Sequence, residues 1–183
     1  AVGGGATADD IIQISFGYGL FTGAPGLHYG LEKIGAVVIP ASSGNTAKQL
    51  MMFRDFGVTG LVATPSYALY LSEVMKEQGY PRSDYKLRIG LLGSESCTPE
   101  MRAQIEENMG IFVSDNYGMT ELGGPGVAGE CHLRCGLHFA EDHFLPEIID
   151  KDTGEPKAPG EAGELVVTTL TREGMPVLRY RTK

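Results

Sequence analysis

"LRIGLLGSESCTPEMRAQIEENMGIFVSDNYG", residues 87–118, places two apolar runs on either side of an amphipathic stretch. The runs 87–93 and 111–118 are rich in Ile, Leu, Val and Phe, which is typical of buried strands. Between them, Thr98 can cap a helix whose first position is Pro99. A strand, a helix and a second strand in this order predict a parallel pair joined by a helical crossover.

The same alternation extends toward the N-terminus. Strands are expected at 11–16, 36–40 and 60–65, with 36–40 as a buried strand, and helices at 27–35, 47–57 and 66–80. Apolar stripes support the first two helices, one made by Leu27, Leu31 and Ile34 and the other by Leu50, Phe53 and Phe56. Five short strands separated by helices predict an α/β fold with a wound, mostly parallel sheet and flanking helices.

The pattern changes near residue 130. Three runs with strand character, 138–150, 163–171 and 176–182, are connected by turn-rich sequence. We therefore expect an α/β adenylate-binding subdomain over 1–130, followed by a smaller β-rich segment over 131–183.

Composition limits the classes of function. The 183 residues are 42% hydrophobic and 21% charged, with a formal net charge of −8. These values are typical of a soluble globular protein and disfavour a nucleic-acid partner, which clustered Lys and Arg would bind. No apolar run is long enough to span a membrane and no signal peptide is apparent, so we expect a cytoplasmic protein without a membrane partner.

The glycine-rich stretch "GYGLFTG", residues 17–23, is close to a dinucleotide-binding fingerprint. Its last gap is one residue too long, and Phe21 lies where backbone would approach phosphate. A loop whose glycines relieve backbone strain would account for most matches of this kind, so the stretch is weak evidence of a dinucleotide site.

"DNYGMTE", residues 115–121, supplies the parts of an ATP site. Tyr117 offers a flat face for adenine, Gly118 permits close backbone approach, Thr120 can donate to phosphate and Glu121 can bind Mg²⁺. A surface turn with a buried tyrosine is the alternative. Because ligands bind beyond the carboxyl ends of parallel strands, the loops 16–23, 91–96 and 115–121 should meet at one edge.

Several stretches together resemble one family of enzymes. "SFGYGLFTGAPGLHYGLEKIGAVVIP", "LLGSES", "DNYGMTELGGPGVAGEC", "EDHFLPEIID" and "GELVVTTLTREGMPVLRYRT" are similar, in order, to the phenylacetate–coenzyme A ligases of the adenylate-forming superfamily. The resemblance implies an aryl-acid–CoA ligase. Such an enzyme uses ATP to convert a carboxylate into an acyl-adenylate with release of pyrophosphate, and coenzyme A then displaces AMP.

The resemblance also assigns residues to roles. It implies that the nucleotide contacts Gly93, Ser94, Glu95, Ser96, Asp115, Asn116, Tyr117 and Gly118. Thr120 would contact the phosphate and Glu121 would hold Mg²⁺, so these two are the expected catalytic residues. Donors and a cation placed there would stabilise charge that develops on phosphorus.

The family's acyl pocket implies a substrate site lined by Phe16, Tyr18, Phe21, Leu27 and Pro125, with residue 116 closing it. Its aromatic wall suits a ring-bearing acid. Phe16 stands where the family has tyrosine, and Asn116 where it commonly has an aliphatic residue. Phenylacetate itself is the expected substrate, and the polar Asn116 could accept a substituted ring as an alternative.

Cys131, Cys135 and His138 have spacing that can form a structural zinc site, although the fourth ligand is unassigned. Reduced, half-buried thiols beside a hydrogen-bonded histidine are the alternative. We expect His143 to be a structural or hydrogen-bonding residue.

The resemblance implies an internal fragment of a ligase, with the phosphate loop before residue 1 and the mobile C-terminal domain after residue 183. We expect such a fragment to lack turnover by itself, and a homodimer is consistent with the family. Two other classes of function stay open: a nucleotide-binding module without ligase chemistry, and a zinc-stabilised interaction domain.

Overall fold

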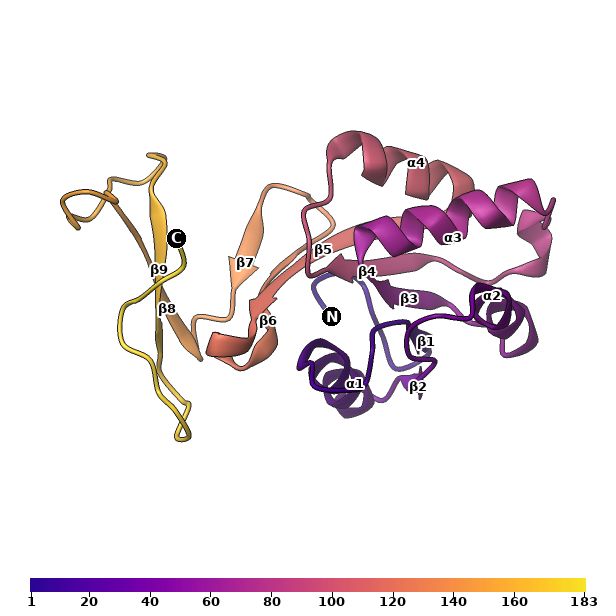
Figure 1. Ribbon diagram of the computed structural model, residues 1–183, viewed down its shortest axis with the longest axis horizontal. Coiled ribbons are helices and arrows are strands. Elements are labelled where there is room, and N and C mark those ends of the chain that lie inside the picture. The colour runs from indigo at the N-terminus through magenta and orange to yellow at the C-terminus, as the bar shows by residue number, and fades with distance from the viewer. The chain divides into compact units, whose positions relative to one another are not determined.

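The computed structural model describes residues 1–183 and divides the chain into two compact units. The first unit is Ala1–His138 and the second is Phe139–Lys183. Figure 1 traces both units along the chain.

The first unit is built on a seven-stranded sheet with the order β2-β1-β3-β4-β5-β6-β7. The strands are β1 (Ile11–Ile14), β2 (Val37–Ile39), β3 (Gly60–Ala63), β4 (Ile89–Gly93), β5 (Phe112–Met119), β6 (Gly124–Glu130) and β7 (Leu137–Phe139). Strands β1 to β5 pair in parallel and β6 pairs antiparallel to β5. The expected α/β fold with a mostly parallel sheet is confirmed.

Four α-helices connect these strands: α1 (Gly23–Lys33), α2 (Thr46–Asp55), α3 (Pro65–Glu77) and α4 (Pro99–Met109). Short 3₁₀ helices, η1 (Arg82–Asp84) and η2 (Thr120–Leu122), complete the unit. The cap expected at Thr98 is present, because its hydroxyl accepts a hydrogen bond from the backbone N–H of Met101. Figure 1 shows α3 and α4 side by side, with α1 across the sheet from them.

Strand alternation gives the sheet a core on each face. Ile12 and Leu91 belong to the apolar cluster beneath α1, whereas Leu61 and Leu92 belong to the cluster beneath α2, α3 and α4. Successive residues of a strand face opposite sides of the sheet. Because β3 and β4 are covered on both faces, all their residues are buried and they are apolar throughout.

Two details of the expected packing are wrong. The run 36–40 was expected to be a buried strand, but β2 lies at the edge of the sheet and Val37 is 58% exposed. Phe56 does not extend the apolar stripe of α2, because the helix ends at Asp55 and the Phe56 ring is 55% exposed.

The second unit is a three-stranded antiparallel sheet with the order β10-β9-β8. Its strands are β8 (Phe144–Ile149), β9 (Glu164–Thr169) and β10 (Tyr180–Arg181). The run 138–150, expected to be one strand, is split between β7 and β8. The two compact units divide after His138, and the subdomain boundary expected at residue 130 stays a prediction.

None of the helices combines the length and the apolar character needed to cross a membrane.

Asp10 ties the start of β1 to two neighbouring segments. Its carboxylate accepts hydrogen bonds from the Thr59 hydroxyl at 2.7 Å, from Arg88 Nε at 2.9 Å and from the Thr7 backbone N–H at 2.8 Å. Burial of this carboxyl favours its neutral form, but the hydrogen bonds from Arg88, Thr59 and Thr7 outweigh that effect and lower its pKa. The ionised form therefore stabilises the fold.

We predict that Asp10→Asn lowers the free energy of unfolding by about 1–2 kcal/mol at pH 7, since it removes a buried charge that three groups hydrogen-bond. A depressed folded-state pKa contributes stability above the unfolded pKa, and this contribution is lost as the pH falls through the folded value. The deficit of the variant should therefore shrink below about pH 4. Urea denaturation at several pH values measures it, with the exposed neighbour Asp9→Asn as the control. Equal losses in both variants would contradict the assignment.

Candidate active site

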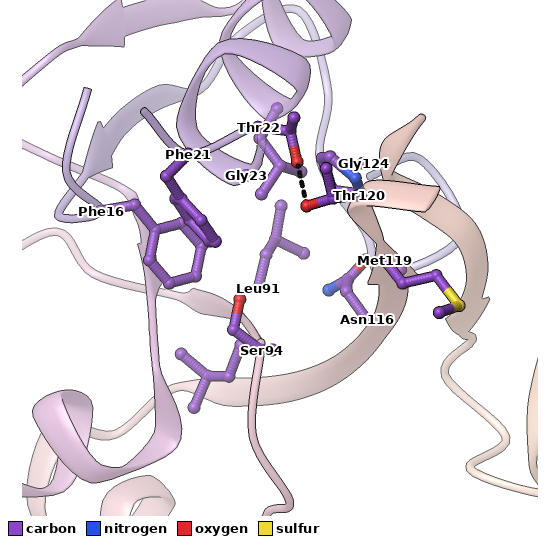
Figure 2. Close-up of a pocket in the computed structure, with 15 residues that line it drawn as sticks. Phe16, Phe21, Thr22, Gly23, Leu91, Ser94, Asn116, Met119, Thr120 and Gly124 are labelled. Atoms are coloured by element: carbon purple, nitrogen blue, oxygen red, sulfur yellow. Dashed lines mark hydrogen bonds between the residues drawn. The ribbon is translucent and has the colours of Figure 1, made fainter. Parts of the chain in front are cut away.

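A cavity of about 160 Å³ lies in the first unit, where β4 and β5 end (Figure 2). Three segments far apart in the sequence line it. They contribute Phe16, Phe21, Thr22, Gly23 and Leu27 from β1 to α1, Leu91, Leu92, Gly93 and Ser94 from β4, and Asn116, Gly118, Met119, Thr120, Gly124 and Pro125 from β5 to β6.

The register of β4 and β5 sets the floor of this cavity. Gly93 is the partner of Asn116 in the parallel ladder. A Cβ atom at position 93 would lie 2.4 Å from the Asn116 carbonyl oxygen, so only glycine permits this approach. This arrangement agrees with the expectation that the loops 16–23, 91–96 and 115–121 meet at one edge of the sheet.

An aromatic pair forms one wall. The rings of Phe16 and Phe21 meet edge to face, with centroids 5.7 Å apart and an interplanar angle of 70°. Phe16 is buried and Phe21 is partly exposed, and Figure 2 shows both rings on the same side of the cavity. Leu27 and Pro125 add further apolar surface.

The polar side chains of the lining are all uncharged, namely Thr22, Ser94, Asn116 and Thr120. Asn116 Nδ2 donates to the Ser114 carbonyl oxygen at 3.3 Å. The hydroxyls of Thr22 and Thr120 lie 3.4 Å apart and point toward each other (Figure 2). An anionic ligand here would have to be held by neutral donors and by backbone N–H groups.

Some expected site residues point elsewhere. The Tyr18 hydroxyl lies 2.9 Å from His28 Nδ1, and burial together with the charge of Glu32 raises the pKa of Tyr18 to about 12. The Glu95 carboxylate accepts a hydrogen bond from the Ser66 backbone N–H at 2.6 Å, at the start of α3. Neither residue lines the cavity, and the exposed Ser96 does not line it either.

The remaining residues of the 115–121 stretch lie beside the cavity without lining it. Side chains alternate along β5, so Asn116 and Gly118 line the cavity while Asp115 and Tyr117 do not. Burial raises the pKa of the Asp115 carboxyl. Burial and the charge of Glu121 raise the pKa of the Tyr117 hydroxyl, which donates to Met119 Sδ at 3.6 Å. Glu121 is an exposed residue of η2, immediately after Thr120.

The candidate zinc site at Cys131, Cys135 and His138 is not supported. His138 Nε2 lies 3.2 Å from Cys131 Sγ, but the exposed Cys135 thiol contacts the Leu133 carbonyl oxygen instead. Across residues 1–183, no group of three or more His, Cys, Asp or Glu side chains is arranged to hold a metal ion. His143 Nδ1 lies 2.8 Å from the Thr171 hydroxyl, which fits the hydrogen-bonding role expected for it.

Six lining residues were not predicted individually, although all of them except Gly124 lie in the loops expected to meet at this edge: Thr22, Gly23, Leu91, Leu92, Met119 and Gly124. Leu91 and Leu92 are apolar strand residues that resemble any others of the core. Thr22 could have been noticed because it lies between the aromatic Phe21 and the helix that begins at Gly23, a position where a hydroxyl usually caps.

Comparison with known proteins identifies the family of this chain. Residues 13–171 match the family model described as AMP-binding enzyme. This chain belongs to that family. Over 181 residues it is 49% identical to the phenylacetate-coenzyme A ligase of Escherichia coli, and over 180 residues it is 48% identical to the one from Pseudomonas putida. These matches confirm the expected resemblance.

Each match covers 98% of this chain but 41% of the relative, so the chain spans less than half the length of these ligases. Solved structures support the fold over a similar extent. A 2-hydroxyisobutyryl-CoA ligase in complex with 2-HIB-AMP and CoA superposes with a TM-score of 0.91 at 24% identity, covering 98% of this chain and 40% of that one. A long-chain-fatty-acid-CoA ligase from Archaeoglobus fulgidus gives 0.77 at 17% identity, covering 92% and 36%.

Ser94 adopts a left-handed backbone conformation, with φ of 73°, at the edge of the cavity. This conformation is costly for a residue with a Cβ atom. We predict that Ser94→Gly raises the free energy of unfolding by about 0.5–1 kcal/mol, because glycine adopts positive φ without strain. Urea denaturation measures the change.

Ser96→Gly is the matched control, since Ser96 is also exposed and has no positive φ. It should be neutral or mildly destabilising, because glycine increases the conformational entropy of the unfolded chain. A gain in stability from Ser96→Gly as large as that from Ser94→Gly would refute the strain at position 94.

Proposed function

We propose that this chain is the acid-binding and nucleotide-binding part of an AMP-forming aryl-acid–coenzyme A ligase. The observation that carries the proposal is the meeting of three segments at one cavity. An aromatic wall formed by Phe16 and Phe21 faces hydroxyls from Thr22 and Thr120. The family and the phenylacetate-coenzyme A ligase relatives support the same reaction class.

The size of the cavity favours a single-ring acid. An apolar protein cavity of about 150 Å³ holds one benzene molecule, and the cavity here is about 160 Å³. Phe16, Phe21, Leu27 and Pro125 would contact the ring. Asn116 has one amide hydrogen that is not used by the Ser114 carbonyl bond, so a ring carrying an acceptor substituent is an alternative to phenylacetate.

The nucleotide is proposed to lie beyond the ends of β4 and β5. Gly93 and Ser94 border the cavity there, and the partly buried ring of Tyr117 offers a face on which a base can stack. Glu95 and Ser96 follow the end of β4 and Asp115 lies within β5, and the contacts of these three residues with the nucleotide stay a prediction.

Thr120 and Glu121 suit the ATP–Mg²⁺ complex. Mg²⁺ in such sites is typically bound through one or two carboxylates together with substrate phosphates. Glu121 is an exposed residue that directly follows Thr120 in η2. When bound, the ion would neutralise phosphate charge, while Thr120 would donate a hydrogen bond to the phosphate. The proposed acyl acceptor is the thiol of coenzyme A. The expected homodimer and cytoplasmic location stay predictions.

A segment exchange tests the proposal. The part of the Escherichia coli phenylacetate-coenzyme A ligase that matches this chain is replaced by residues 1–183, and thioester formation is measured with phenylacetate, ring-substituted phenylacetates, benzoate and hexanoate. We expect activity with phenylacetate or a ring-substituted phenylacetate, and at least about tenfold lower kcat/KM with hexanoate, because the aromatic wall favours a ring.

The control is the same exchange carrying Gly93→Ala, which should be inactive because the added Cβ would collide with β5. AMP binding without thioester formation from any acid would favour a nucleotide-binding module. A preference for hexanoate would contradict the aryl-acid assignment.

A further inference from the structure

The Thr22 hydroxyl does not cap helix α1, although Thr22 occupies the capping position. Thr22 immediately precedes α1, and threonine at this position commonly accepts a hydrogen bond from the backbone of the first helical turn. Here the side chain makes no such bond, and the residue itself has helical φ and ψ angles of −79° and −18°. The hydroxyl is instead directed into the cavity toward Thr120 (Figure 2).

The contact between the two threonines is long. Their oxygen atoms are 3.4 Å apart, whereas an O–H···O hydrogen bond is usually 2.7–2.8 Å. Both hydroxyls can therefore donate to a ligand oxygen at small cost. Each hydroxyl has one hydrogen to donate, so Thr22 can donate to an oxygen of a carboxylate while Thr120 donates to the phosphate beside it.

The fold makes room for Thr22 at this place. A Cβ atom on Gly124 would lie 3.1 Å from Thr22 Cβ and 3.2 Å from its hydroxyl oxygen. Gly124 also has a φ of 113°, a conformation that favours glycine. The close approach of β6 to Thr22 thus depends on the absence of a side chain at position 124.

The composition of the lining leaves few groups to bind an anion. No Lys, Arg or His lines the cavity, and its polar side chains are two threonines, one serine and one asparagine. In Figure 2, Thr22 and Thr120 lie together, whereas Ser94 lies apart from them near Leu91. Of the three hydroxyl side chains in the lining, Thr22 and Thr120 are therefore the two that lie together.

We infer that Thr22 is a substrate-binding residue whose hydroxyl donates a hydrogen bond to the carboxylate of the acid, beside Thr120. The inference rests on the proposed function. The hydroxyl orients the carboxylate for attack on the α-phosphorus. One carboxylate oxygen forms the new bond to phosphorus, the bond from phosphorus to the bridging oxygen breaks, and pyrophosphate leaves with that electron pair. Thr22 keeps its proton throughout.

Binding measurements on the 183-residue chain test this role. Phenylacetate, and toluene as a ligand with the ring but no carboxylate, are titrated into ¹⁵N-labelled wild type, Thr22→Val and Thr22→Ser while amide shifts are followed. Valine has the shape of threonine without the hydroxyl. We expect Thr22→Val to weaken phenylacetate binding at least about tenfold, as for loss of a hydrogen bond to a charged group.

Toluene binding should change less than about twofold in Thr22→Val, and Thr22→Ser should restore phenylacetate binding because serine keeps the hydroxyl. A merely structural role would weaken both ligands together and would overturn the inference. Unchanged phenylacetate affinity in Thr22→Val would overturn it as well, while leaving the proposed function intact. If wild type binds neither ligand, the inference and the proposed aryl-acid site fail together.

Discussion

The structure of the site depends on the close parallel pairing of β4 with β5. Gly93 and Asn116 are partners in that ladder, and the space between Gly93 and the Asn116 carbonyl excludes any side chain. Because parallel strands end at the same edge, the pairing places the Gly93–Ser94 turn beside the Asn116–Thr120 segment. The glycine-rich loop after β1 then completes the cavity with its two phenylalanine rings.

The absence of charged side chains from the lining bears on how such a site would handle charge. A carboxylate and a phosphate repel each other, and no lysine or arginine of the lining offsets that repulsion. Hydroxyl donors, backbone N–H groups and a bound cation are then the means by which negative charge can be stabilised. Glu121 does not line the cavity, but it directly follows Thr120, which does.

The architecture could be predicted from the sequence because local signals agreed with the final packing. Thr98 and Pro99 mark the start of α4, and the apolar run 87–93 becomes a strand buried on both faces. β6 was missed because "GPGVAGE" consists largely of residues with low strand propensity, and its pairing with β5 overrides that preference. β2 was misjudged because an apolar run does not reveal whether its strand is central or at an edge.

The site was predicted only in part, because sequence motifs locate residues but do not show where their side chains point. Motifs located Phe16, Phe21, Gly93, Asn116 and Thr120, all of which line the cavity. The motifs did not show that the Tyr18 hydroxyl contacts His28, or that the Glu95 carboxylate accepts a hydrogen bond at the start of α3. Thr22 was overlooked because its importance comes from a contact with a residue 98 positions away in the chain.

Three distant segments are proposed to form one binding site for an aryl adenylate. Hydrogen–deuterium exchange of this chain, with and without a non-hydrolysable phenylacetyl-adenylate analogue, tests this directly. We predict that residues 16–23, 91–96 and 116–125 gain protection together, while β8 and β9 of the second unit are unchanged. Protection confined to a single one of these segments, or none in all three at saturating analogue, would contradict it.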